Sequence, residues 1–242
     1  MRLLASLLLL GALTASSLAA DHILSFRADL RLFGYSTGQK VPEYSSVIFL
    51  SNDVLLVSIN QWRFGPDAST AKLIVFELLK KGAIRQAVMP VRPWSHSVAP
   101  LNNSEFLVLT GPEVTLCTAE LRCEKSFETD GLVSNLDQEN MKWLKGGEDL
   151  VLRPEESSVD GSRSLGMELR STTWNKTTHP LDIDEPAPPN YRRIDVYDKS
   201  VAKVIFSLEY NPKNHIVPAA LSPNGAKLAI VRDGKLEVYD LA

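Results

Sequence analysis

The chain has 242 residues, with 26 Lys or Arg against 29 Asp or Glu, so its formal net charge at pH 7 is −3. This mildly acidic balance, without a run of basic residues, excludes the electrostatic footprint of a protein that binds nucleic acid or anionic lipid. Hydrophobic residues make up 44% of the chain and charged residues 23%, which are ordinary values for a soluble globular protein.

Residues 1–19 have the organisation of a secretory signal peptide. Arg2 supplies the positive start, residues 3–13 form a short apolar run, and Ser17 and Ala19 are small residues at the cleavage positions. We expect cleavage after Ala19 and export to the periplasm or the medium, leaving one domain over residues 20–242. The alternative, an uncleaved anchor helix, is open, although the run is short for a span of ~20 apolar residues. No later stretch is apolar enough to cross a bilayer, so we predict no stable membrane span after signal removal.

Four later segments share one pattern: a leucine, a polar turn and then an apolar strand. They are residues 46–59, 97–110, 140–152 and 217–231. We interpret each as the two inner strands of a four-stranded unit. Third strands are predicted at residues 73–77, 114–117, 194–198 and 236–240, and fourth strands at 83–89, 122–127 and 202–208.

The spacing of these units is that of a repeat protein. Phe76 and Cys117 are 41 residues apart, and Tyr197 and Tyr239 are 42 apart, as in a repeat of ~40–45 residues with four strands. Residues 153–190 contain five prolines and clusters of acidic and hydroxyl residues, so we predict an irregular insertion there.

The last unit lacks a fourth strand. Residues 22–33 alternate between apolar and polar side chains and could fill its place, which would also close a ring of units. An incomplete ring, or a fifth unit, is the alternative.

The C-terminal residues 221–240 carry the clearest motif. Ser222-Pro-Asn-Gly225 precedes two alternating strands joined through Asp233-Gly234, a strong hairpin signal because Gly adopts positive φ freely. The motif resembles a blade of YncE-like and WD40-like β-propellers, and residues 49–61 and 116–123 are similar to exported YncE-like bacterial proteins. The resemblance implies an all-β, β-propeller-like array of about four four-stranded antiparallel blades. The units end in Tyr-Asp rather than the Trp-Asp of WD40 repeats, at residues 197–198 and 239–240.

Propeller geometry places the longer connections on one face, where binding residues usually lie. Seven candidate binding residues fall in or beside these connections: Trp62, Arg63, Trp94, His96, Trp174, Tyr191 and His215. Trp, Tyr and Arg are common anchors of interfaces. The alternative is that the aromatic residues pack the loops onto their own blades and that His96 and His215 are structural hydrogen-bonding groups.

The two cysteines, Cys117 and Cys123, lie in a predicted strand–turn–strand segment. Because export favours disulfides, we predict that they are bonded; two free thiols or a soft-metal pair are the alternatives.

The motifs of hydrolases, metalloproteases and nucleotide-binding proteins are absent from the sequence, so we expect no cofactor and no metal. The sequence therefore predicts a non-catalytic binding or scaffolding module with a protein or peptide partner. A TolB-like component of an envelope complex, suggested by the motif at residues 222–229, and a propeller lyase or hydrolase acting on extracellular polymers are alternatives.

Overall fold

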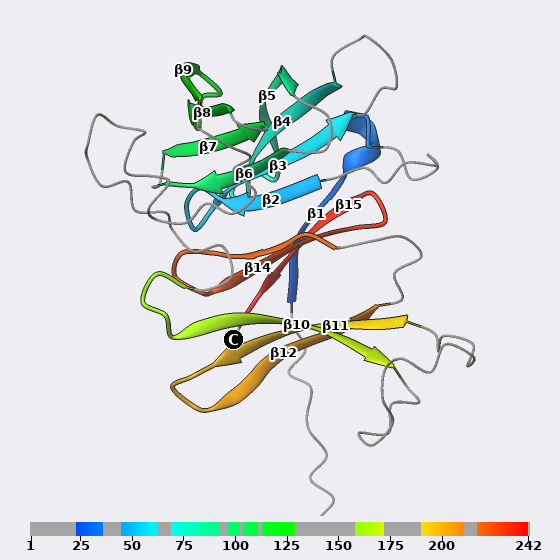
Figure 1. Ribbon diagram of the computed structural model, residues 1–242. Coiled ribbons are helices and arrows are strands. Elements are labelled where there is room, and N and C mark those ends of the chain that lie inside the picture. The colour runs from blue at the N-terminus through cyan, green and yellow to red at the C-terminus, as the bar shows by residue number, and fades with distance from the viewer. Residues whose placement is uncertain are drawn as a thin grey trace, which may run out of the picture.

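The computed structural model describes residues 23–35, 45–61, 69–91, 96–101, 104–110, 113–128, 158–171, 190–210 and 217–241. In these ranges fifteen strands form four antiparallel sheets, and a short 3-10 helix, η1 (Leu30–Phe33), follows the first strand (Figure 1). The predicted all-β class is confirmed. No helix in the described part of the chain is long and apolar enough to span a bilayer. The predicted signal peptide lies outside the described residues.

Two of the sheets are built from four consecutive strands, as the repeats predicted. Sheet B contains β2 (Ser45–Phe49), β3 (Val54–Gln61), β4 (Ser69–Glu77) and β5 (Gly82–Val91). Sheet C contains β6 (His96–Pro100), β7 (Glu105–Thr110), β8 (Glu113–Thr118) and β9 (Cys123–Glu128). In both sheets the middle strands carry buried residues at consecutive positions, and apolar clusters cover both faces of sheet B.

Sheet A joins the two ends of the chain. It contains β13 (Ala219–Leu221), β14 (Lys227–Arg232), β15 (Lys235–Asp240) and, beside β15, the N-terminal strand β1 (Ile23–Asp29). The predicted pairing of the N-terminal segment with the last unit is confirmed, with Ala28 opposite Leu236. The predicted tight turn is also present, since Asp233 and Gly234 both have positive φ, 51° and 73°.

Sheet D contains β10 (Arg163–Ser171), β11 (Asn190–Asp198) and β12 (Lys203–Tyr210). Strand β10 lies inside the interval 153–190 that we expected to be irregular, and it pairs with β11 over nine residues. The alternation of Leu165, Met167 and Leu169 with polar or small residues explains this strand. The inner strands predicted at residues 140–152 lie outside the described residues.

The four sheets pack face to face in the order D, A, B, C (Figure 1). One apolar cluster lies between each neighbouring pair. The clusters are centred on Val196 and Ile230 between D and A, on Phe76 and Val238 between A and B, and on Leu73 and Phe106 between B and C. The strands thus bury three apolar clusters between the sheets, and the turns and loops lie at the two ends of the strands.

Candidate functional site: the loop end of the sheets

One end of the molecule, which we call the turn end, holds a short turn from each of the four sheets, namely the β2–β3, β6–β7, β11–β12 and β13–β14 turns. The backbone N–H of Val159 in sheet D donates to Pro223 O of sheet A at 2.8 Å. Asn224 N of sheet A donates in turn to Asn52 Oδ1 of sheet B at 3.1 Å. Because the strands are antiparallel, the β3–β4 and β10–β11 connections leave from the opposite end, here called the loop end, which also holds the short β7–β8 connection and the tight turn at Asp233-Gly234. In Figure 1 the turn end of sheets A and D is on the left and their loop end on the right.

The candidate binding residues fall at the loop end as far as the structure describes them. His96 is the first residue of β6 and lies opposite Thr110. Tyr191 is near the start of β11, opposite Arg170. Both are placed by backbone alone. The other five candidates, Trp62, Arg63, Trp94, Trp174 and His215, lie outside the described residues.

Between sheets B and C, the interface changes from apolar to polar towards the loop end. Strand alternation places Ser58 and Asn60 on the face of Leu56, which packs against sheet C. By the same alternation Ser69 faces sheet C from β4, and Thr110 faces sheet B from β7. All four are buried, with exposed fractions of 0% for Ser58, 2% for Asn60, 0% for Ser69 and 3% for Thr110. We call these four residues the polar layer.

Two members of the polar layer have buried side-chain atoms that find no hydrogen-bond partner among the described residues. These atoms are Asn60 Oδ1 and Ser69 Oγ. A buried polar group left unsatisfied costs about 1–3 kcal/mol, so native proteins retain few of them. A third such atom, Thr118 Oγ1, lies at the turn end of sheet C. The loop end of the B–C interface therefore has two unused hydrogen-bonding atoms, on residues that are diagonal neighbours in sheet B.

The chemistry of the polar layer is neutral. Its side chains are hydroxyls and one carboxamide, which donate and accept hydrogen bonds but do not titrate near neutral pH. The described carboxylate closest to the polar layer in the strand register is that of Glu113, which is half-buried at the start of β8 and lies opposite Thr110. Among the described residues, no group of three or more His, Cys, Asp or Glu side chains is placed to hold a metal ion. Such a layer can bind a polar, uncharged group.

A buried ionic cluster lies on the face of sheet A that packs against sheet D. Glu237 accepts hydrogen bonds from Arg27 Nη2 at 2.7 Å, from Arg232 Nε at 2.7 Å and from the Tyr239 hydroxyl at 2.9 Å. Burial by itself would raise the pKa of Glu237, but the hydrogen bonds from Arg232 and Tyr239 outweigh it and hold the pKa below its usual value. The tilted contact between the Tyr239 ring and Phe206, with centroids 5.2 Å apart, ties the cluster to β12. Since all its strong acceptor positions are used, we assign this cluster to the stability of the A–D interface.

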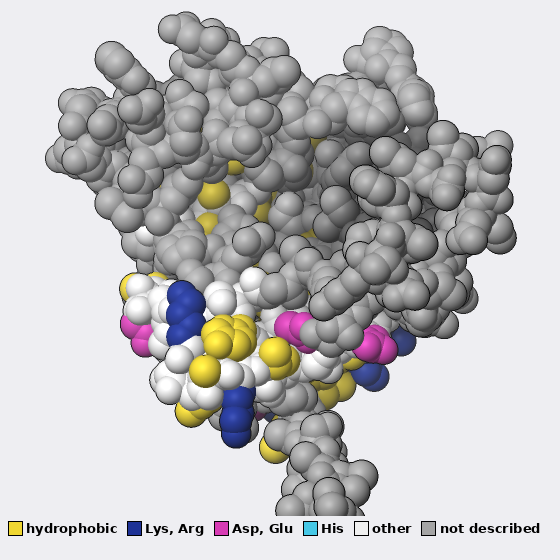
Figure 2. Space-filling model, turned by 60° about the horizontal axis from the view of Figure 1, so that its bottom comes forward, with side chains coloured by type: hydrophobic (Ala, Val, Ile, Leu, Met, Phe, Trp, Pro, Cys, Tyr) yellow, Lys and Arg dark blue, Asp and Glu magenta, His cyan; other side chains and the backbone are white. Residues whose placement is uncertain are grey.

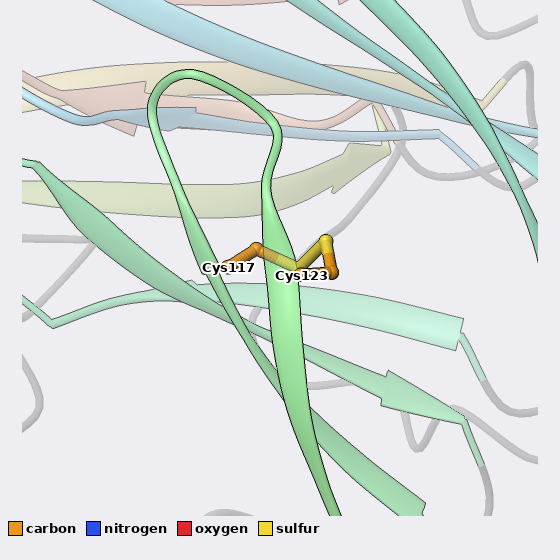
Figure 3. Close-up of a disulfide and its surroundings, with 2 residues drawn as sticks. All are labelled: Cys117 and Cys123. Carbon is orange, nitrogen blue, oxygen red and sulfur yellow. A yellow bond between two sulfur atoms is a disulfide. The ribbon is translucent and has the colours of Figure 1, made fainter.

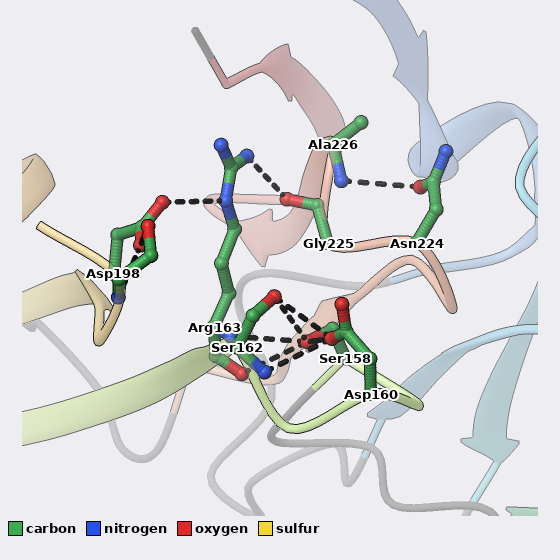
Figure 4. Close-up of polar contacts among 9 residues, drawn as sticks. Ser158, Asp160, Ser162, Arg163, Asp198, Asn224, Gly225 and Ala226 are labelled. Carbon is green, nitrogen blue, oxygen red and sulfur yellow. Dashed lines mark hydrogen bonds and ion pairs between the residues drawn. The ribbon is translucent and has the colours of Figure 1, made fainter.

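Two turns at the turn end have the same hydrogen-bond pattern, and Figure 4 shows the first of them. In the first, Ser158 Oγ accepts from Arg163 N at 3.0 Å and donates to Asp160 Oδ1 at 2.6 Å. In the second, Ser222 Oγ accepts from Lys227 N at 2.9 Å and contacts Asn224 Oδ1 at 2.8 Å. The turn before β10 is thus a second copy of the C-terminal motif.

Arg163 joins these two turns. Its Nη1 donates to Gly225 O at 2.9 Å, and its Nε donates to Asp198 Oδ2 at 3.2 Å (Figure 4). Hydrogen bonds from Ser158 and then Ser162 lower the pKa of Asp160 to about 2. Every group in this network has a partner within it, so its role is to fasten sheet D to sheet A.

The predicted cysteine pair is joined in the structure across the β8–β9 hairpin (Figure 3). The Cα atoms of Cys117 and Cys123 are 4.1 Å apart, and they face each other in the strand register. Cys117 is buried in the core between B and C, whereas Cys123 is exposed. The bond therefore anchors an edge hairpin to the core.

Sheet D carries exposed apolar side chains, namely Tyr197 at 38%, Val201 at 55% and Val204 at 49%. Figure 2 views the molecule from the side of this sheet, and its apolar side chains lie there among basic and acidic ones. Apolar residues in such mixed surroundings are normal on a protein surface, so we do not place the site there.

Comparison with known proteins assigns no family. No protein-family model and no curated protein matches the chain. Among solved structures, Pyrococcus horikoshii acylaminoacyl peptidase is 11% identical with a TM-score of 0.28, over 81% of this chain and 32% of the peptidase. The complex of KlAtg21 with the coiled coil of AgAtg16 is 14% identical with a TM-score of 0.27, over 86% of this chain and 54% of the other. BBS1N, solved in complex with ARL6DN, is 7% identical with a TM-score of 0.29, over 86% of this chain and 69% of the other.

These TM-scores are too low to support a conclusion about fold or function. The chain also spans about a third of the length of the peptidase. The site must therefore be interpreted from its own residues.

The polar layer was missed by reasoning from sequence, although a signal was available. In residues 56–60 the order Leu-Val-Ser-Ile-Asn places polar residues at every second position of an otherwise apolar strand. In a strand covered on both faces, such alternation marks one face that turns polar.

Proposed function

We propose that this chain is an exported, non-catalytic binding module of the β-propeller type, whose loop end receives a protein or peptide partner. In this interpretation sheets A, B, C and D are successive blades and sheet A combines the first and last strands of the chain. The face-to-face order of the sheets, with a short turn of each sheet at the turn end, supports the blade interpretation.

The observation that carries the proposal is the polar layer between sheets B and C. Its unpaired atoms, Asn60 Oδ1 and Ser69 Oγ, lie where β3 ends and β4 begins. The candidate anchors Trp62 and Arg63 lie in the connection between these two strand ends, and Trp94 lies in the connection from β5 to β6 at the same end of the molecule. A neutral hydrogen-bonding layer beside such anchors suits recognition, since binding sites combine apolar contact with a few placed polar groups.

A library of displayed random peptides, selected against the oxidised protein, tests this proposal. For an enriched peptide, hydrogen–deuterium exchange should show protection at loop-end amides, those of Asn60 and Thr110, and unchanged exchange at the turn-end amides of Leu50 and Leu101. Failure to enrich any peptide, or protection confined to the turn end, would refute the loop end as the binding face.

A further inference from the structure

The two unpaired atoms of the polar layer have complementary capacities. Asn60 Oδ1 can only accept a hydrogen bond, whereas the Ser69 hydroxyl can donate one. Asn60 lies opposite Ala71, two residues along β4 from Ser69, so the two side chains are diagonal neighbours on one face of the sheet. Diagonal neighbours of this kind have Cα atoms about 7–8 Å apart. A single planar group with one donor and one acceptor could bridge them.

We propose that Asn60 and Ser69 bind one uncharged amide of a peptide ligand. The amide N–H donates to Asn60 Oδ1, and the amide oxygen accepts a hydrogen bond from the Ser69 hydroxyl. This assignment rests on the proposed function of the loop end and specifies the chemical group that it recognises.

An uncharged ligand group follows from the surroundings of the two atoms. Asn60 and Ser69 are almost completely buried, and the other members of the layer, Ser58 and Thr110, are neutral. A charged group placed at Asn60 and Ser69 would lose its hydration without an opposite charge on either residue, which is unfavourable. The carboxylate of Glu113 lies opposite Thr110 in the register of sheet C, so an anion would also meet a like charge on that side. An amide loses less and gains two hydrogen bonds that the protein does not otherwise make.

The chain provides a matched control in Thr118. Its Oγ1 is also buried and unpaired, but it lies at the turn end of sheet C, away from the polar layer. Ser69→Ala and Thr118→Val each remove an unsatisfied hydroxyl, so both should leave the melting temperature unchanged or raise it. Only Ser69→Ala removes a proposed ligand contact.

The test is an NMR titration of the isotope-labelled full chain, with its disulfide intact, using small amides. N-methylacetamide represents the peptide backbone, acetamide represents an Asn or Gln side chain, and acetate and methylammonium are the charged comparisons. We expect saturable shifts of the Asn60 side-chain signal and the Ser69 backbone signal with at least one amide and none with the ions. The amide that saturates at the lower concentration identifies the source of the ligand group.

The variants decide whether these two residues are responsible. Asn60→Leu and Ser69→Ala should each weaken amide binding at least tenfold, and Thr118→Val should leave it unchanged. Absence of saturation in the wild type, saturation by acetate, or equal binding by Ser69→Ala would overturn the inference.

The outcome is separable from that of the proposed function. A peptide that binds the loop end of the wild type and of Ser69→Ala equally would support the binding face and overturn the amide site. Amide saturation that depends on Ser69, without any peptide binder, would support the amide site and overturn the peptide partner.

Discussion

The contact between sheets D and A predicts unequal effects of alanine at two equivalent glycines. Gly225 and Gly161 occupy the same position in the two copied turns, with φ of +69° and +68°. A Cβ at Gly225 would lie 2.9 Å from Arg163 Cδ and 3.1 Å from Ser158 Cβ, whereas a Cβ at Gly161 would meet nothing within 4 Å. Both substitutions therefore carry the backbone strain of positive φ, but only one disturbs the interface.

The magnitudes follow from these contacts. Positive φ costs an alanine about 1–2 kcal/mol, which is the expected loss of unfolding free energy for Gly161→Ala. Gly225→Ala must also displace Arg163 and weaken its hydrogen bond to Gly225 O, a type of bond with a net value of about 1.5–3 kcal/mol. Because the Arg163 side chain keeps 19% exposure, part of that loss is recovered by water, and the expected total is about 2–4 kcal/mol.

Urea denaturation followed by tryptophan fluorescence would measure both variants against the wild type. We expect the midpoint of Gly225→Ala to fall clearly below that of Gly161→Ala at a similar m-value. Equal losses of unfolding free energy, within about 0.5 kcal/mol, would contradict the argument that the Arg163 contact fastens sheet D to sheet A.

Three further predictions concern the disulfide, the ionic cluster and the core. Replacing Cys117 and Cys123 together by Ala should lower the unfolding free energy by about 2 kcal/mol, because the disulfide closes a loop with a sequence separation of 6 in the unfolded chain. A reductant should lower the melting temperature of the wild type and leave that of the double variant unchanged. The pKa of Glu237 is lower in the folded protein than in the unfolded chain. The contribution of Glu237 to the unfolding free energy is therefore present above the unfolded pKa and is lost as the pH falls through the folded pKa. Glu237→Gln should consequently flatten the acid side of a plot of melting temperature against pH. Leu30→Ala, at a fully buried position in η1, should cost about 2–5 kcal/mol in calorimetry or denaturant unfolding, and a loss below 1 kcal/mol would contradict its place in the core between A and B.

Much of the fold could be predicted because the chain repeats short, local signals. The strands of sheets A, B and C could be predicted from alternation, from the Asp233-Gly234 turn and from the spacing of the units. The strand at residues 23–29 was predicted to pair with the last unit because that unit lacked a fourth strand. The disulfide followed from the hairpin that contains both cysteines.

The strand β10 was missed because the prolines at both ends of the interval 153–190 outweighed its alternation. The better signal was Ser158-Val-Asp-Gly-Ser162, which matches Ser222-Pro-Asn-Gly-Ala226 in its hydroxyl, its side-chain acceptor and its glycine. The alternation in residues 56–60 marked only the part of the polar layer that lies in β3, since the whole layer depends on which faces of β3, β4 and β7 meet across two sheets. The aromatic candidates were placed by connection alone, and the structure describes the backbone of His96 and Tyr191 only.

The pairing of β1 with β15 also constrains the order in which the molecule can be completed. Sheets B and C are made of consecutive strands and can form from local contacts as the chain is synthesised. Sheet A lies between sheets B and D, and its formation requires β1 to pair with β15. This pairing closes a larger loop than the pairings within the other sheets. Until that step occurs, the apolar faces of sheets B and D that will contact sheet A are uncovered. The chain is therefore most exposed to misassociation just before β1 and β15 pair.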